Sequence, residues 1–147
     1  MPLIQSLFST EKMNFNIATR FEDAAKANPN KVVLVGPQNS FTWEELDLRA
    51  GGVARFLDQA GIGPGERVAV LFDDPVNTII AVLGCLKKGC AVTPLHSRST
   101  TREQKKILGV LKPAYFLKKL TDTREKYQPT TVKFKDPAII LFTSGST

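Results

Sequence analysis

The sequence predicts an α/β fold, a layered sandwich in which helices cover a largely parallel β-sheet. Short apolar runs alternate along the chain with segments of helical spacing. One run, residues 67–72 (RVAVLF), is apolar at consecutive positions, as expected of a strand that helices cover on both faces. A helix and a second strand follow it. This order is that of a right-handed crossover unit, and the chain repeats it.

The first helix is expected at residues 17–28, where four apolar residues fall on one face. These residues are Ile17, Phe21, Ala24 and Ala25. Pro29 ends the helix. The apolar run 32–35 (VVLV) then indicates a strand, and residues 36–40 (GPQNS) indicate the turn that follows it.

Thr42 and Glu45 predict where the next helix begins. The Thr42 hydroxyl caps the helix while Glu45, three residues later, reaches back to the Thr42 amide, which makes a capping box. The helix therefore begins at Trp43, and Gly61 ends it in the left-handed conformation that helix termini often need. Its apolar stripe consists of Leu46, Ala50, Val53, Ala54 and Leu57.

Another capped helix is expected at residues 76–88, after the apolar strand. Pro75 lies at or near its first position, where a missing amide proton costs little. Asp73 or Asp74 caps it, and capping explains these two carboxylates better than a metal site does. The helix leads to a short apolar strand at residues 91–95.

A further helix is expected after Thr100, with Glu103 again placed three residues later. It carries Ile107, Val110 and Leu111 toward the core, and a proline ends it. This helix completes the second crossover.

The last part of the chain is expected to add two strands around a linker. Residues 114–119 (AYFLKK) form the first strand. Residues 120–136, rich in Lys and Thr, form the linker, with one short strand at 131–134 (TVKF). The apolar run 137–142 (PAIILF) is predicted to be a buried strand.

A glycine between hydroxyl residues follows that last strand directly. These candidate binding residues are Thr143, Ser144, Gly145, Ser146 and Thr147. Parallel α/β sheets bind ligands outside the carboxyl ends of their strands. Successive amides at such a turn form a concavity that holds an anion, and the hydroxyls add donors, so the loop suits phosphate oxygens. The loop is not the GxxxxGK[ST] P-loop, and taken alone such a turn is more often a plain connection.

Four motifs, in this order, resemble the N-terminal part of the adenylate-forming superfamily, which comprises acyl-CoA synthetases, nonribosomal-peptide adenylation domains and luciferases. The motifs are residues 41–46 (FTWEEL), 61–72 (GIGPGERVAVLF), 86–95 (LKKGCAVTPL) and 140–147 (ILFTSGST). The resemblance spans residues 15–147. The phosphate-binding motif of that family, TSGSTGxPKG, matches Thr143 to Thr147 and is then cut off.

The resemblance implies a reaction for the full-length enzyme. The loop would hold the β and γ phosphates of ATP while a carboxylate attacks the α-phosphorus, giving an acyl adenylate and pyrophosphate. A thiol then captures the adenylate. ATP with Mg²⁺ and a carboxylic acid substrate are therefore implied, with CoA as the expected acceptor.

The chain is expected to consist of a loose leader, residues 1–14, and an N-terminal α/β subdomain, residues 15–147, truncated inside the phosphate-binding loop. The motif's lysine and the later motifs of the family are not among the 147 residues. We therefore expect the N-terminal portion of an ATP-dependent acid-activating ligase, acyl-CoA synthetase-like and inactive by itself. No catalytic residue and no metal ligand is assigned.

An alternative belongs to another class of function. The chain would then be a non-catalytic scaffold or partner-binding module derived from such an enzyme. Because large exposed apolar patches promote association, it would self-associate, or need its missing remainder or a partner to cover its apolar faces.

The charge distribution raises a third and weaker alternative, binding of an anion or a nucleic acid. The net charge of +6 divides into −3 for residues 1–75, with 7 Lys/Arg and 10 Asp/Glu, and +9 for residues 76–147, with 13 Lys/Arg and 4 Asp/Glu. The basic residues occur as separate pairs without regularly interleaved aromatics, which disfavours nucleic acid.

Composition also bears on location. No apolar stretch is long enough to cross a bilayer, and no basic region precedes the first apolar residues, which argues against a secretory signal. We expect a cytoplasmic protein. Cys85 and Cys90 lack the CxxC spacing of redox and zinc sites and are expected to be small buried apolar residues.

Overall fold

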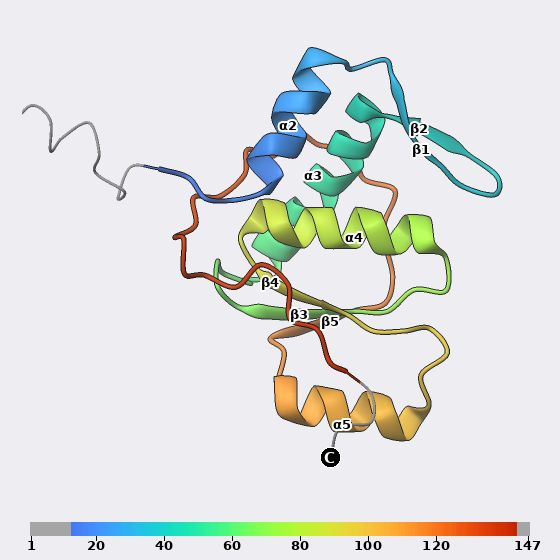
Figure 1. Ribbon diagram of the computed structural model, residues 1–147, viewed down its shortest axis with the longest axis vertical. Helices are drawn as coiled ribbons and strands as arrows, with labels where there is room; N and C mark the ends of the chain where they lie inside the picture. The colour runs from blue at the N-terminus through green and yellow to red at the C-terminus, as the bar shows by residue number, and fades with distance from the viewer. Residues whose placement is uncertain (1–12, 144–147) are drawn as a thin grey trace, which may run out of the picture.

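The computed structural model describes residues 13–143, which form an α/β fold around a parallel sheet (Figure 1). The sheet has the strand order β4-β3-β5. Its strands are β3 (Arg67–Val70), β4 (Ala91–Pro94) and β5 (Tyr115–Leu117), and β3 pairs in parallel with both neighbours. Val68, Ala69 and Val70 of the central strand are fully buried. The predicted fold class and the doubly covered strand are confirmed.

Two helices make the crossovers between these strands. α4 (Pro75–Lys88) joins β3 to β4, and α5 (Thr101–Leu111) joins β4 to β5. The two connections run in opposite directions across the sheet, so right-handed crossovers place their helices on opposite faces. Figure 1 shows α4 on one face and α5 on the other.

A second layer of helices covers α4. α3 (Trp43–Gln59) packs along α4, and α2 (Ala18–Ala27) packs on α3. Gly84 permits the close approach of α4, because a Cβ there would overlap the side chain of Val53. The predicted stripe of α3 is buried in this core: Leu46, Ala50, Val53, Ala54 and Leu57.

The helix starts follow the predicted caps. The Thr42 hydroxyl accepts from the Glu45 amide at 3.2 Å, and the Glu45 carboxylate accepts from the Thr42 amide at 2.8 Å. Thr100 and Glu103 make the same capping box at α5. At α4 the carboxylate of Asp74 accepts from the Val76 amide at 2.9 Å, which settles the choice between the two aspartates.

The first predicted strand lies outside the parallel sheet. β1 (Val32–Val35) pairs with β2 (Ser40–Thr42) as a separate antiparallel hairpin, and β2 was not predicted. The turn closes at once, since the Gly36 amide donates to the Asn39 carbonyl at 2.8 Å. A connection this short can join antiparallel strands only, because parallel neighbours need a crossover of a dozen residues or more.

The prediction for α5 was wrong at one position. Val110, expected to point inward, is 67% exposed. Leu108 is half-buried instead, beside half-buried Ile107 and buried Leu111. Leu108 and Ile107 lie three and four residues before Leu111 and share its face, whereas Val110 is adjacent in sequence and points about a quarter-turn away.

The prediction of a strand at 131–134 was also wrong. The backbone of Val132 pairs instead with the N-terminal segment. Its carbonyl accepts from the Phe15 amide at 3.3 Å, and its amide donates to the Asn14 side chain at 3.2 Å. Residues 134–136 form a turn.

The last predicted strand, residues 137–142, is reduced to one bridge. Ile139 pairs in parallel with Val92 of β4, so the segment has the expected direction. It is not buried, since Leu141 is 70% exposed. Among residues 13–143 no further strand pairs with its outer edge, which explains the difference.

Residues 120–130, which we call the strap, cross α3 in extended form. The Glu125 amide donates to the Leu48 carbonyl at 3.0 Å. Two adjacent glycines of α3 permit the crossing, because a Cβ at Gly51 or Gly52 would overlap the backbone carbonyl of Glu125 or Thr123. The predicted linker is therefore a packed part of the fold.

Candidate functional site

The topology indicates where a ligand would bind. In open parallel sheets, ligands occupy the crevice at the carboxyl edge where the strand order reverses. The chain passes from β3 to β4 on one side and then crosses back to β5 on the other. The reversal therefore lies between the carboxyl ends of β3 and β5.

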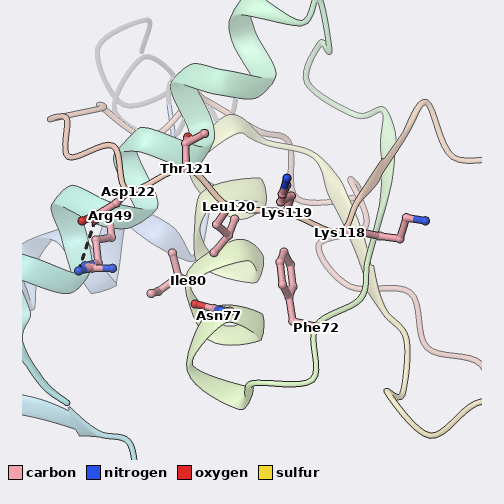
Figure 2. Close-up of a pocket in the computed structure, with 9 residues that line it drawn as sticks. All are labelled: Arg49, Phe72, Asn77, Ile80, Lys118, Lys119, Leu120, Thr121 and Asp122. Carbon is pink, nitrogen blue, oxygen red and sulfur yellow. Dashed lines mark ion pairs between the residues drawn. The ribbon is translucent and has the colours of Figure 1, made fainter. Parts of the chain in front are cut away.

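A cavity of about 340 Å³ lies at this position (Figure 2). Phe72, just beyond β3, and Leu120, just beyond β5, line it together with Ile80 of α4. These three side chains supply an apolar surface. Asn77, on the first turn of α4, adds an amide group.

Arg49 of α3 contributes a charged group to the cavity wall. Its Nη2 lies 3.3 Å from Oδ1 of Asp122 on the strap. Its guanidinium carbon lies 4.9 Å from the centre of the Phe41 ring, within the range of a cation–π contact. The Arg49 side chain is 24% exposed, and its buried Nε has no hydrogen-bond partner among residues 13–143.

Two lysines follow β5 at the same edge. The Lys118 ammonium lies 5.1 Å from the centre of the Phe116 ring and points away from the cavity in Figure 2. Lys119 and Thr121 also belong to the lining. The lining residues thus include three basic residues, of which Lys118 points away, and one acidic residue, Asp122.

Thr143, the one predicted phosphate-binding residue that the structure describes, lies elsewhere on this edge. Thr143 is exposed and does not line the cavity. It follows the segment that bridges β4, so it lies on the far side of β4 from the cavity. Ser144, Gly145, Ser146 and Thr147 are outside the described residues.

Sequence reasoning did not find the cavity residues. Arg49 comes from the middle of a helix, and Asp122 was assigned to a linker, so no local pattern connects them. The available signal was positional: Phe72 and Lys119 are each the last residue of a predicted strand of the parallel sheet, at the edge where ligand sites form.

A second cavity, of about 660 Å³, lies between α2, the start of α3 and the strap. Three of its five charged residues, Glu22, Lys26 and Asp47, are already paired. The Lys26 ammonium lies 3.5 Å from the Glu22 carboxylate, and Asp47 makes a 2.7 Å ion pair with buried Lys87.

The cysteines offer no reactive thiolate. Burial raises the pKa of Cys85 and also raises the pKa of Cys90, to about 11. Both thiols are buried and free of disulfides, so their prediction as small buried apolar residues is confirmed. No group of three or more His, Cys, Asp or Glu side chains within residues 13–143 is arranged to hold a metal ion.

No helix in the described part of the chain is long and apolar enough to cross a membrane.

The model of the AMP-binding enzyme family matches residues 21–128. The chain belongs to this family. The match contains α3, the whole parallel sheet and most of the strap. The predicted relationship to the N-terminal part of the adenylate-forming superfamily is confirmed.

Similar curated proteins are large synthetases. The chain is 27% identical over 155 residues to nonribosomal peptide synthetase GRA1 of Gibberella zeae, covering 89% of this chain and 2% of that protein. It is 30% identical over 153 residues to the enniatin synthase of Fusarium equiseti, covering 86% and 5%. The chain thus spans a small part of these relatives.

Solved structures confirm the fold. VinN in complex with L-aspartate superimposes with a TM-score of 0.80 at 18% identity, over 90% of this chain and 45% of that one. The N-terminal subdomain of NpsA from Klebsiella oxytoca superimposes with a TM-score of 0.78 at 23% identity, over 90% and 40%.

Proposed function

We propose that the chain is the N-terminal part of an enzyme that activates a carboxylic acid with ATP. An oxygen of the acid attacks the α-phosphorus, the bond from that phosphorus to the bridging oxygen breaks, and pyrophosphate leaves. The product is an acyl adenylate, whose acyl group then passes to a thiol. Membership of the AMP-binding enzyme family is the observation that carries this proposal.

The phosphate-binding part of the proposal concerns residues Thr143 to Thr147. The segment before them runs parallel to β4, so the chain leaves the sheet at its carboxyl edge, where ligands bind. Amides and hydroxyls of this loop would hold the β and γ phosphates of ATP. Mg²⁺ would neutralise part of the phosphate charge, and the described residues offer no carboxylate cluster to bind it.

The proposal also concerns the identity of the thiol that receives the acyl group. The motifs favour an acyl-CoA synthetase-like enzyme with CoA as acceptor, whereas the relatives named above are nonribosomal peptide synthetases. That likeness supports a carrier-protein thiol and an amino acid substrate. Measuring acyl transfer to CoA and to a carrier protein in parallel decides between the two acceptors.

The test uses the full-length product of the reading frame and the exchange of labelled pyrophosphate into ATP. We expect exchange that depends on one of a panel of amino acids and other carboxylic acids, and none from the 147 residues alone. Gly145→Ala should reduce exchange, because its methyl group would hinder approach of the phosphates. Gly109→Ala is the control, since a Cβ there meets no neighbour.

A full-length enzyme that shows no exchange with any acid, or equal exchange by both glycine variants, would count against this function.

We further propose that residues 1–14 form a loose leader and residues 15–147 form the subdomain. Limited proteolysis tests these bounds, because the protease should cleave near residue 14. A cytoplasmic location is proposed because the reaction consumes ATP, and cell fractionation tests it.

We also propose a second candidate function, a non-catalytic module that associates with itself or a partner. Exposed apolar residues near the end of the described chain favour it: Phe134, Ile139, Leu141 and Phe142. Analytical ultracentrifugation of the 147-residue chain should then show a dimer or larger assembly at micromolar concentration. A monodisperse monomer would remove the self-associating form of this candidate.

A further inference from the structure

The cavity between β3 and β5 is separate from Thr143, the residue at which the predicted phosphate loop begins. Its lining comes from α3, α4 and the segments after β3 and β5, whereas Thr143 follows the segment beside β4. The strand order places the cavity at the reversal of the sheet, the position at which such sheets bind ligands. A ligand there would be additional to the nucleotide of the proposed function.

Arg49 has binding capacity that the fold does not use. Within residues 13–143 its only ion pair is the 3.3 Å contact with Asp122, longer than the 2.7–2.9 Å typical of a charge-assisted hydrogen bond. The guanidinium has five N–H donors in a planar fork that matches a carboxylate or phosphate group. Contact with the Phe41 ring holds this fork in place.

Asp122 is a weak competitor for this guanidinium. The Asp122 side chain is 65% exposed, and ion pairs with an exposed partner contribute little to stability. A bound anion could therefore replace the carboxylate of Asp122 while the strap stays in place on α3. Glu125 also anchors the strap, because its carboxylate accepts a 2.8 Å hydrogen bond from Arg55.

The rest of the lining limits what such an anion carries. Phe72, Ile80 and Leu120 supply the apolar side chains of the lining, and Asn77 adds one amide (Figure 2). A volume of about 340 Å³ is at the lower end of the range for small-molecule sites. The lining therefore fits one anionic group joined to a compact apolar group.

We propose that this cavity binds a small organic anion, with its carboxylate or phosphate on Arg49 and its apolar group against Phe72, Ile80 and Leu120. Lys119 adds a second positive charge at the rim. Recognition of the ligand depends on both its anionic group and its apolar group.

The experiment is titration of the 147-residue chain, followed by amide NMR shifts and calorimetry, with four probes. Benzoate and phenyl phosphate carry both the charge and the ring, inorganic phosphate lacks the ring, and benzamide lacks the charge. Arg49→Gln is compared with Arg55→Gln. Both arginines lie on α3 and pair with strap carboxylates, but only Arg49 lines the cavity.

Saturable binding of benzoate or phenyl phosphate, with shifts at Asn77 and Leu120, is expected, and the better probe identifies the anionic group. Arg49→Gln should weaken it by about tenfold or more, the usual contribution of a hydrogen bond to a charged group, whereas Arg55→Gln should leave it unchanged. Inorganic phosphate and benzamide should bind more weakly. No binding at millimolar concentration, equal loss in both variants, or equal affinity for all four probes would overturn the proposal.

Discussion

Removal of the Asp47 carboxylate should destabilise the fold more than any other single loss of charge on α3. Lys87, at the end of α4, is buried, with its side chain 1% exposed. Its ammonium makes a 2.7 Å ion pair with Asp47 and donates to the Tyr127 carbonyl of the strap at 3.0 Å. The lysine thereby joins α4, α3 and the strap.

Asp47→Ala would leave the buried ammonium with one neutral partner. Breaking a buried ion pair in this way costs about 3–5 kcal/mol, because the remaining charge is not compensated. For a chain of this size, such a loss lowers the melting temperature by about 6–20 °C. Urea unfolding followed by circular dichroism measures the free energy directly, and a thermal scan checks it.

The adjacent lysine provides a matched control. Lys88 makes a 2.6 Å ion pair with Asp58, whose side chain is 40% exposed, so Asp58→Ala should cost clearly less than Asp47→Ala. The double variant Asp47→Leu with Lys87→Met should be close to wild type, since apolar residues often replace a buried pair without loss. If Asp47→Ala lowers the free energy of unfolding by less than about 1 kcal/mol, the ammonium of Lys87 does not depend on a buried ion pair with Asp47.

Two further predictions concern the strap and acid stability. Gly52→Ala should destabilise the chain, because its methyl group would meet the Thr123 carbonyl, whereas Gly109→Ala should not; thermal unfolding of both variants tests this, and equal melting temperatures would contradict the crossing. The hydrogen bond from Lys88 and the charge of this lysine lower the pKa of Asp58 in the folded state. The pair therefore stabilises the fold fully above the ordinary pKa of about 3.9, and this stabilisation is lost as the pH falls through the lower pKa of the folded state. Asp58→Asn should therefore be less stable than wild type at pH 7, and the difference in free energy of unfolding should shrink steadily as the pH is lowered below the ordinary pKa in urea titrations. A difference that does not change with pH would exclude this pair as the cause.

Helix starts were predictable because their signals are local. Thr42 and Glu45 satisfy each other's amides within four residues, and the structure has both bonds. Asp74 likewise caps α4 beside Pro75, although the sequence left two aspartates open. Apolar runs also identified all three strands of the parallel sheet, since strands covered on both faces are apolar at consecutive positions.

Features that depend on distant segments were not predictable in this way. The strap looked like a linker because its sequence is polar, and its packing depends on Gly51 and Gly52, some seventy residues earlier. The run at 137–142 was apolar enough for a buried strand, but burial requires neighbours on both sides, and only β4 pairs with it here. Arg49 became a candidate only when the fold brought α3 beside the end of β5.

The carboxyl edge of the sheet therefore carries two candidate positions, and their residues allow each to be tested separately. Arg49 lies on α3 at the β3–β5 side, whereas Gly145 belongs to the loop that follows the segment beside β4. Substitutions at sites that share no partners usually have additive effects. In the full-length enzyme, Arg49→Gln and Gly145→Ala should then change pyrophosphate exchange additively. A departure from additivity would mean that occupation of the cavity and binding of phosphate depend on each other through the sheet between them.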